Sequence, residues 1–172
     1  VSGAFIDYLP GCYATIRKNE AVKHHHQKYP DDKYAPAWKA LEYMTFGDIL
    51  YLIANLKDNH LRQLIAAHYQ IRNLHAFESY MNTIRLMRNL CAHGHNICDL
   101  KLQKSIKAGP IIAIEGDRHH NLTGCLLVIS YVLRTISANR ADEMKARLEE
   151  RFSWPEMELI KDIVGNIEIA LL

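Results

Sequence analysis

The sequence predicts an all-α fold with at most one short strand or hairpin, on three observations. Glycine and proline, which a turn-rich β fold needs in number, account for only 8 and 5 of the 172 residues. Apolar residues recur in steps of three and four over most of the chain, which is the period of a helix face. Hydrophobic residues make up 49% and charged residues 23%, as in ordinary globular chains rather than disordered ones.

The length of the chain suits one domain. A chain of 172 residues can bury a single core, and it shows no internal repeat, low-complexity tract or long linker. We therefore expect residues 1–172 to form a single helical domain. The chain begins at Val1 rather than at a methionine, which leaves room for an N-terminal element before it.

The first helix is expected over Gly11–Gln27, after a stop at Pro10. Three consecutive histidines, His24–His26, point 100° apart on such a helix. They therefore cannot all bind one metal ion, and a solvated face is expected for them. A loop follows at Tyr29–Lys33, where a proline and two aspartates interrupt the helical pattern.

The next three helices are predicted from the residues at which they start. Pro36 suits the first position of a helix. Thr45, with Asp48 three residues on, fits a capping box, and Asp58 or Asn59 can cap the helix that follows. The side chains of these helices that are expected to pack are Trp38, Leu41, Tyr43, Phe46, Ile49, Leu50, Tyr51, Leu52, Ile53, Leu61, Leu64, Ile65 and Tyr69.

The clearest amphipathic helix runs from about Leu74 to His93, and Gly94 is a natural residue to end it. Its apolar side chains follow steps of three and four: Phe77, Tyr80, Met81, Ile84, Met87 and Cys91.

The last third of the chain is first ambiguous and then helical. Within Ile97–Gly116, the run Ile111–Ile114 fits a short strand and a buried helix turn equally well. Asn121 can cap a mostly apolar helix that runs to Ser137 and is expected to be central to the core. Two more helices are expected, over Ala141–Phe152 and from Pro155 towards Gly165.

Composition restricts the cellular setting more than the function. A net charge of +2 is too small to indicate a nucleic-acid partner by itself. None of the four cysteines forms a CxxC pair, so free thiols in a reducing cytoplasm are expected. The longest apolar run, Leu122–Ile136, is interrupted by polar residues and is too short to span a bilayer.

One short stretch carries recognisable chemistry: Arg88-Asn89-Leu90-Cys91-Ala92-His93, followed at once by Gly94. A guanidinium is permanently charged and its fork matches phosphate oxygens, and an imidazole can exchange protons near neutral pH. Such a pair is the minimum needed to grip or cut a phosphodiester without a metal.

The spacing of the pair does not place it on one face. At 100° per residue, Arg88 and His93 lie about 140° apart on a helix. Arg85, Asn89 and His93, at successive steps of four, do share a face. Taken alone, the stretch also fits a charged, solvated helix end whose histidine favours the helix dipole.

The stretch Arg88–His93 resembles the Arg-x4-His signature of the HEPN superfamily of helical RNases. The run Pro36-Ala37-Trp38-Lys39-Ala40-Leu41-Glu42, then Phe46-Gly47-Asp48-Ile49-Leu50, is similar to a Pro-x-Trp-x-x-x-Glu and Phe-Gly stretch of the Abi-like (abortive infection) family within it. Lys28-Tyr29 and Phe152-Ser153-Trp154-Pro155 also lie where that family has comparable residues. The likeness covers most of the chain from about His24 onward.

The resemblance implies a HEPN-like helical bundle with added helices, in which two Arg-x4-His motifs meet across a homodimer without metal or cofactor. In that scheme His93 is a general base or acid on the ribose 2′-OH or the leaving oxygen. Arg88 stabilises the charge on the phosphorane, and Asn89 orients His93 or a phosphate oxygen. The product carries a 2′,3′-cyclic phosphate, so the substrate is RNA.

Other residues are candidates for RNA binding. Lys101, Lys104 and Lys107 recur every three residues, so on a helix they would form one basic stripe that can track a phosphate backbone. Arg85 and His95 are expected to add to this surface. The plain alternative is a solvent-facing charged stripe without a ligand.

A metal or nucleotide cofactor is not expected. Cys91-x-His93-x-His95-x-x-Cys98 holds four possible zinc ligands in eight residues, but the spacing is not a standard one. Cys91 also falls on the apolar face of its helix, where a core thiol is expected. No Gly-rich phosphate loop is present, and His119-His120 are expected in a polar turn without a chemical role.

The sequence thus predicts a metal-independent endoribonuclease of the HEPN type in the bacterial cytoplasm, acting in phage defence or as a toxin. RNA, a second copy of the chain, and a small-RNA or protein antitoxin are the expected partners, and a membrane is not. The first alternative is a non-catalytic RNA- or protein-binding module of such a system. Gly94-His95-Asn96 favours it, because family members usually carry a basic residue shortly after the motif. A third hypothesis is a structural dimerisation domain that accompanies a separate toxin.

Overall fold

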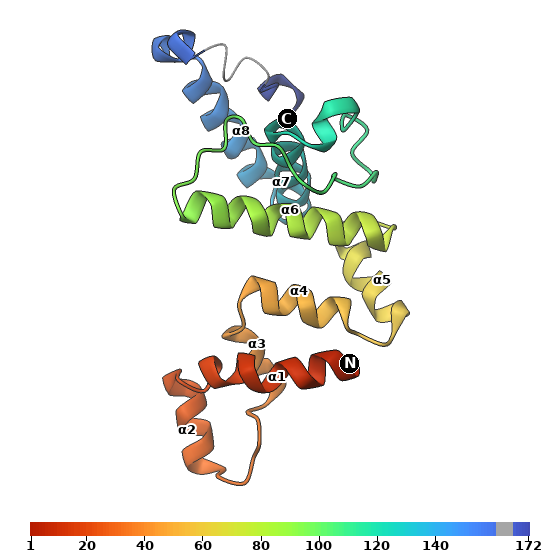
Figure 1. Cartoon of the computed structure of the whole chain (residues 1–172), viewed down its shortest axis with the longest axis vertical. Helices are drawn as coiled ribbons and strands as arrows, with labels where there is room; N and C mark the ends of the chain where they lie inside the picture. Colours follow the sequence, from red (N-terminus) through yellow and green to blue (C-terminus); the bar gives the residue numbers. More distant parts are fainter. Residues whose placement is uncertain (161–166) are drawn as a thin grey trace. The chain divides into compact units, whose positions relative to one another are not determined.

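The computed structural model describes residues 1–160 and 167–172, and it confirms the all-α class. No strand occurs among these residues, so the hairpin allowed by the sequence is not formed in them. The chain divides into two compact units, Val1–Arg62 and Gln63–Leu172 (Figure 1). The expectation that residues 1–172 form a single domain stays a prediction, and each unit is described by itself.

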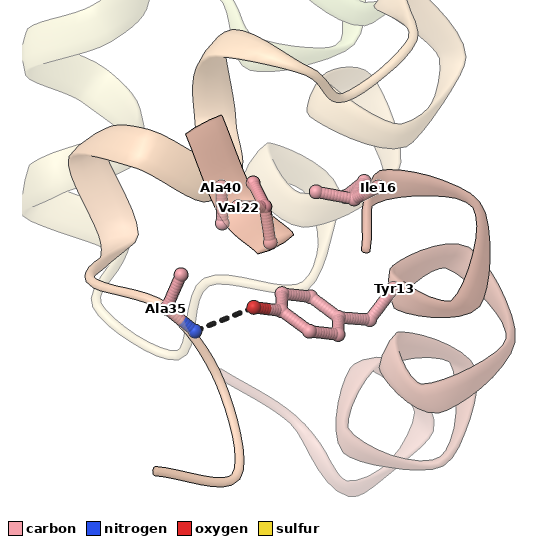
Figure 2. Close-up of a cluster of buried hydrophobic side chains, with 5 residues drawn as sticks. All are labelled: Tyr13, Ile16, Val22, Ala35 and Ala40. Atoms are coloured by element: carbon pink, nitrogen blue, oxygen red, sulfur yellow. Dashed lines mark hydrogen bonds between the residues drawn. The ribbon is translucent and has the colours of Figure 1, made fainter. Parts of the chain in front are cut away.

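The N-terminal unit is built from four short helices: α1 (Gly3–Ile16), α2 (Glu20–Lys28), α3 (Ala37–Glu42) and α4 (Phe46–Ala54). Its core is a cluster of buried side chains from α1, α2, α3 and the loop before α3 (Figure 2). The residues of this cluster are Tyr13, Ile16, Val22, Ala35 and Ala40. The helix α5 (Asn59–His68) contains the boundary between the units, and Asp58 accepts hydrogen bonds from its first turn, as predicted.

The prediction of one helix over residues 11–27 is wrong, because the chain forms α1 and α2 there instead. The helix α1 starts before Pro10, with Ser2 as its N-cap. A proline inside a helix removes one backbone donor. Here the helix continues because Phe5 and Tyr13, eight residues apart, are both buried on one face of it.

Two of the three consecutive histidines are buried, which corrects the expected solvated face. The side chain of His26 is 2.8 Å from the Tyr13 hydroxyl, and His25 lies 2.9 Å from a carboxylate oxygen of Asp32. The Tyr13 hydroxyl also accepts a hydrogen bond from the Ala35 backbone N–H (Figure 2). The loop between α2 and α3 thus supplies a partner directly to His25, through Asp32. It also supplies one to Tyr13, the partner of His26, through the Ala35 N–H.

The helix α4 has the predicted capping box but not the predicted burial. The Thr45 hydroxyl accepts from the Asp48 backbone N–H, and the Asp48 carboxylate accepts from the Thr45 backbone N–H. No side chain of α4 is buried, and Phe46 and Tyr51 are 41% and 38% exposed. Trp38 of α3 is 68% exposed as well. Pro36 is the N-cap of α3 rather than its first residue.

The C-terminal unit is organised around an apolar helix. Its elements are α6 (Leu74–Ala92), η1 (Gly116–His119), α7 (Leu122–Ile136), α8 (Ala138–Phe152), η2 (Pro155–Ile160) and η3 (Ile169–Leu171). The helix α7 packs against α6, α8 and η1, so its predicted central position is confirmed (Figure 1). Asn121 caps α7 as predicted, and Ser137 both ends α7 and caps α8.

The segment between α6 and η1 has no regular structure, and Ile111–Ile114 forms neither a strand nor a helix turn. The helix expected from Pro155 towards Gly165 is a 3₁₀ helix as far as Ile160, and the remainder lies outside the described residues. Arg118 connects the segment before η1 to the residue before η3. Its guanidinium donates to the Ala113 carbonyl and to both carboxylate oxygens of Glu168. No helix in the described part of the chain has the length and hydrophobicity needed to cross a membrane.

Gly124 allows η1 to approach α7 closely. A Cβ atom added at Gly124 would lie 1.8 Å from the Arg118 carbonyl oxygen, which belongs to the backbone and cannot rotate away. Because overpacking of a core usually costs 1–3 kcal/mol, we expect Gly124→Ala to lower the free energy of unfolding by about that amount. Urea unfolding followed by circular dichroism measures it.

Gly11→Ala is the matched control, because Gly11 lies inside α1 with open space around its missing Cβ. It should raise helix stability by about 0.5–1 kcal/mol. Equal stability of Gly124→Ala and the wild type would contradict the close contact between η1 and α7.

Asp48 makes the N-terminal unit sensitive to acid. Partial burial raises the pKa of Asp48, but hydrogen bonds from the Tyr8 hydroxyl and from Thr45 outweigh it and lower the pKa below 3.8. A carboxylate with a depressed pKa stabilises the fold above its unfolded pKa of about 3.9, and this contribution is lost as the pH falls through the folded pKa. Unfolding free energies should therefore drop below about pH 4.

Tyr8→Phe removes one of those hydrogen bonds. It should cost about 1 kcal/mol at pH 7, less than a buried charged hydrogen bond because the pair is partly solvated, and much less at pH 2. Tyr29→Phe is the control, because Tyr29 is exposed and its hydroxyl makes no hydrogen bond among the described residues. The assignment fails if the destabilisation by Tyr8→Phe is the same at both pH values.

Candidate functional site

The predicted catalytic stretch lies at the C-terminal end of α6, whose apolar face is buried through Phe77, Tyr80 and Met87. The helix ends as the sequence predicts, with Gly94 in the left-handed conformation at φ +66°. The Gly94 N–H donates to the Cys91 carbonyl and the His95 N–H to the Leu90 carbonyl, which together form a Schellman motif. The position of His93 is therefore fixed by a regular helix end.

Arg88 and His93 are both exposed, and no hydrogen bond joins their side chains in the described part of the chain. The Arg88 guanidinium instead donates to the side-chain oxygen of Asn89 over 3.0 Å. The His93 ring has the His95 ring as a neighbour, with the ring centres 6.4 Å apart. One copy of the chain thus presents the guanidinium and the imidazole on different sides of α6.

A groove of about 820 Å³ runs along α6 within the C-terminal unit. One wall is a face of α6, and the other is the irregular segment that follows the helix. The lining residues from α6 are His75, Glu78, Ser79, Asn82, Thr83, Arg85, Leu86 and Leu90, and those from the segment are Leu100–Ser105 and Lys107.

The groove brings together four of the five residues predicted to bind RNA. Arg85 comes from α6, and Lys101, Lys104 and Lys107 come from the opposite wall; all four are exposed. The fifth, His95, does not line it. The lysines do not lie on a helix, so the expected helical stripe is wrong even though they share one groove.

His119 and His120, for which no role was predicted, hold the lysine-bearing wall in place. This wall is the irregular segment that carries Lys101, Lys104 and Lys107. The His119 carbonyl accepts from the Ile106 N–H at 2.8 Å, and the His119 ring donates to the Ile106 carbonyl at 2.6 Å. His120 makes the same pair of bonds with Leu102, at 2.7 and 3.2 Å. These contacts bury Leu102 and Ile106, and the neighbouring lysines remain exposed.

Ser79 holds the end of the same wall to α6, because its hydroxyl accepts from the Lys107 backbone N–H at 3.0 Å. The sequence signal for these supports was weak. Leu102 and Ile106 alternate with lysines in a way that suggests one buried side, but their partners lie 18 and 13 residues away along the chain, respectively. Sequence periodicity does not report hydrogen bonds to backbone groups at that separation.

The three residues predicted to be catalytic, Arg88, Asn89 and His93, extend the groove only in part. Asn89 lies four residues beyond Arg85, and His93 lies three beyond Leu90, so both continue the groove's face of α6 by about one turn. Arg88 points about 140° away from His93 on the same helix. The imidazole therefore lies beyond Leu90, the last residue of α6 that lines the groove, on the groove's side of the helix, and the guanidinium does not lie on that side.

The cysteines and histidines around the motif do not form a metal site in this structure. No group of three histidine, cysteine or acidic side chains in the described residues is arranged to hold a metal ion. Cys91 is exposed rather than buried, which corrects the expected core thiol. Cys125 of α7 is buried instead, and burial raises the pKa of its thiol to about 12.

Comparison with known proteins assigns the stretch from within α1 to just beyond α6 to one family. The family model for the Abi-like protein matches residues 10–99, which is just over half of the chain and includes Arg88, Asn89 and His93. No curated protein and no solved structure matches the chain significantly. The protein belongs to the Abi-like family, and this membership indicates a role in abortive infection, a form of defence.

Proposed function

We propose that the protein is a metal-independent endoribonuclease of the HEPN type that acts in abortive infection. The observation that supports this most is the position of His93: an exposed imidazole at a fixed helix end, on the face along which four cations line a groove. A phosphate backbone that follows the groove leads to this imidazole. The Arg-x4-His pattern in an Abi-like chain gives the proposal its chemistry.

The proposed reaction uses only groups of the chain and the RNA. One His93 takes the proton of a ribose 2′-OH, whose oxygen attacks the adjacent phosphorus. The bond from phosphorus to the 5′ oxygen breaks, and a second, protonated His93 gives a proton to that oxygen. Arg88 stabilises the extra negative charge on the phosphorane. The products are a 2′,3′-cyclic phosphate and a 5′-OH end.

The helix geometry favours two copies for this reaction. Because Arg88 and His93 lie about 140° apart on α6, one helix cannot direct both side chains at one phosphate. Two copies related by a two-fold axis can supply two imidazoles and two guanidiniums to a shared cleft. We therefore propose a homodimer whose site includes the C-terminal end of α6 from each chain.

The same proposal gives the protein its setting. RNA that is free to be cut lies in the bacterial cytoplasm, and an RNase that stops growth there has to be held inactive until it is needed. A small RNA or a protein antitoxin is the proposed inhibitor. Residues 1–172 would act together as one Abi-like domain.

A non-catalytic RNA-binding role is the second candidate. It is favoured by the hydrogen bond from Arg88 to Asn89, which occupies the guanidinium away from His93. It is also favoured because the groove is lined within a single chain and needs no second copy. In this role the motif would hold a phosphate without moving protons.

Cleavage of RNA in EDTA tests the catalytic role. Loss of a general acid or base usually costs 10²–10⁴-fold in rate, so His93→Ala should cut RNA at least about a hundredfold more slowly. Arg88→Ala should cost a similar factor. Wild-type products should carry a 2′,3′-cyclic phosphate, and DNA of the same sequence should stay intact because it lacks the attacking hydroxyl. Gel electrophoresis measures the cleavage of each substrate. Treatment of the products with an enzyme that removes 2′,3′-cyclic phosphates identifies the end group.

His24→Ala is the matched control, because His24 is an exposed helical histidine outside the motif and the groove. It should cut at the wild-type rate. Equal cleavage by the wild type and His93→Ala, or no cleavage of any RNA by the wild type, overturns the catalytic role. Retained RNA affinity that falls steeply with salt would then favour the binding role.

A further inference from the structure

The groove is lined by both positively charged and apolar side chains. Its cations stand at the rim, since Arg85, Lys101, Lys104 and Lys107 are all exposed. None of the four forms an ion pair with a carboxylate in the described part of the chain. Glu78 is the one acidic residue that lines the groove. Unpaired cations that outnumber the acid four to one indicate a polyanionic ligand.

The floor of the groove is apolar. Four leucines are among its lining residues, Leu86 and Leu90 from α6 and Leu100 and Leu102 from the opposite wall; Leu86 is 40% exposed and Leu102 is 8% exposed. Phosphates alone gain nothing from leucine side chains, because a phosphate needs hydrogen-bond donors or positive charge. Unpaired bases do gain, because their faces are apolar and can be taken out of water against such a floor.

A single aromatic ring lines the groove, and it stands at one end. His75 is in the first turn of α6, is exposed, and lies 18 residues before His93. Histidine rings are among the side chains on which unstacked RNA bases stack. His75 and His93 therefore mark the two ends of the same helix face, one suited to a base and the other to a scissile phosphate.

We infer that the groove holds a single strand of RNA, with phosphates on the cationic rim and one unpaired base stacked on His75. This inference rests on the proposed function, because it takes RNA as the ligand. A duplex is disfavoured, since its bases are already stacked inside and its surface presents phosphates to the apolar floor. The strand runs along α6 between His75 and His93.

The two ends of the groove set a length for the ligand. Eighteen residues of helix span about 27 Å at 1.5 Å per residue. Nucleotides that stay stacked on one another advance about 3.4 Å each, so if only the base at His75 leaves the stack, about eight nucleotides reach from the His75 ring to the His93 imidazole. Shorter RNA can occupy one end of the groove but cannot engage both.

Binding of uncleavable RNA tests this inference separately from catalysis. The probes are fluorescent 2′-O-methyl oligoadenylates of about 4 to 12 nucleotides, in which the attacking hydroxyl is blocked, and the same oligomers paired to their complements. Fluorescence anisotropy in EDTA at pH 8 gives the affinities. The affinity of the wild type should rise up to about eight nucleotides and then level off. The single strand should bind at least about tenfold more tightly than the duplex.

Variants separate the stacking contact from the charges. His75→Ala should lower the affinity for long oligomers about fivefold or more, and His75→Phe should restore it. Lys104→Gln should reduce the slope of log affinity against log salt by about 0.7, the value of one lost phosphate contact to a single strand. Lys145→Gln of α8, which removes the same charge outside the groove, should leave the slope unchanged.

Three results would overturn the inference: duplex that binds as tightly as single strand, affinity independent of length, or equal effects of Lys104→Gln and Lys145→Gln. Circular dichroism of each variant shows whether the helices are retained. Absence of cleavage together with length-dependent binding would overturn the proposed catalysis and leave the groove inference intact. Cleavage by the wild type that His75→Ala does not affect at any length would do the reverse.

Discussion

The close contact between α7 and η1 at Gly124 is the constraint on which the basic groove depends. Because Gly124 has no side chain, the Arg118 carbonyl can approach the helix, and η1 lies against α7. His119 and His120 follow directly and bind Ile106 and Leu102 through paired hydrogen bonds. An irregular segment lacks the regular backbone hydrogen bonds of a helix, so its backbone groups need partners in other parts of the chain. The position of the lysine-bearing wall thus depends on how η1 packs against α7 in the core of the C-terminal unit.

This dependence explains why residues with no predicted chemistry matter to the site. A histidine whose Nδ1 donates to a backbone carbonyl fixes the position of that carbonyl, and it can keep the hydrogen bond whether the ring is neutral or charged. Two such histidines bind Leu102 and Ile106, which are four residues apart in the wall. They hold one side of the segment in the core and leave the lysines in solvent. Surface lysines on a mobile loop would lose more conformational entropy on binding than lysines on a wall already ordered.

The sequence predicted best what depends on neighbouring residues. The helix α6, its end at Gly94, the Thr45 capping box and the Asn121 cap all rest on hydrogen bonds between groups within five residues of one another, and all are found. Contacts between distant segments were not predictable in this way. The burial of His25 and His26 needs the loop before α3 and Tyr13, and the path of the lysine wall needs η1. Pro10 was misleading because burial of Phe5 and Tyr13 on one face outweighs one missing hydrogen bond.

The helix end at Gly94 separates two ways in which the motif can work. A regular helix with a Schellman motif leaves Arg88 and His93 on different faces, and no unwinding brings them together within one chain. The side chain of Arg88 is held by Asn89, so it reaches a phosphate near His93 only if that hydrogen bond is exchanged for one to the ligand. Such an exchange costs little at an exposed site, because the hydrogen bond there contributes little to stability. This arrangement fits the proposed homodimer, in which the groove of each chain would lead the proposed RNA strand to the shared site.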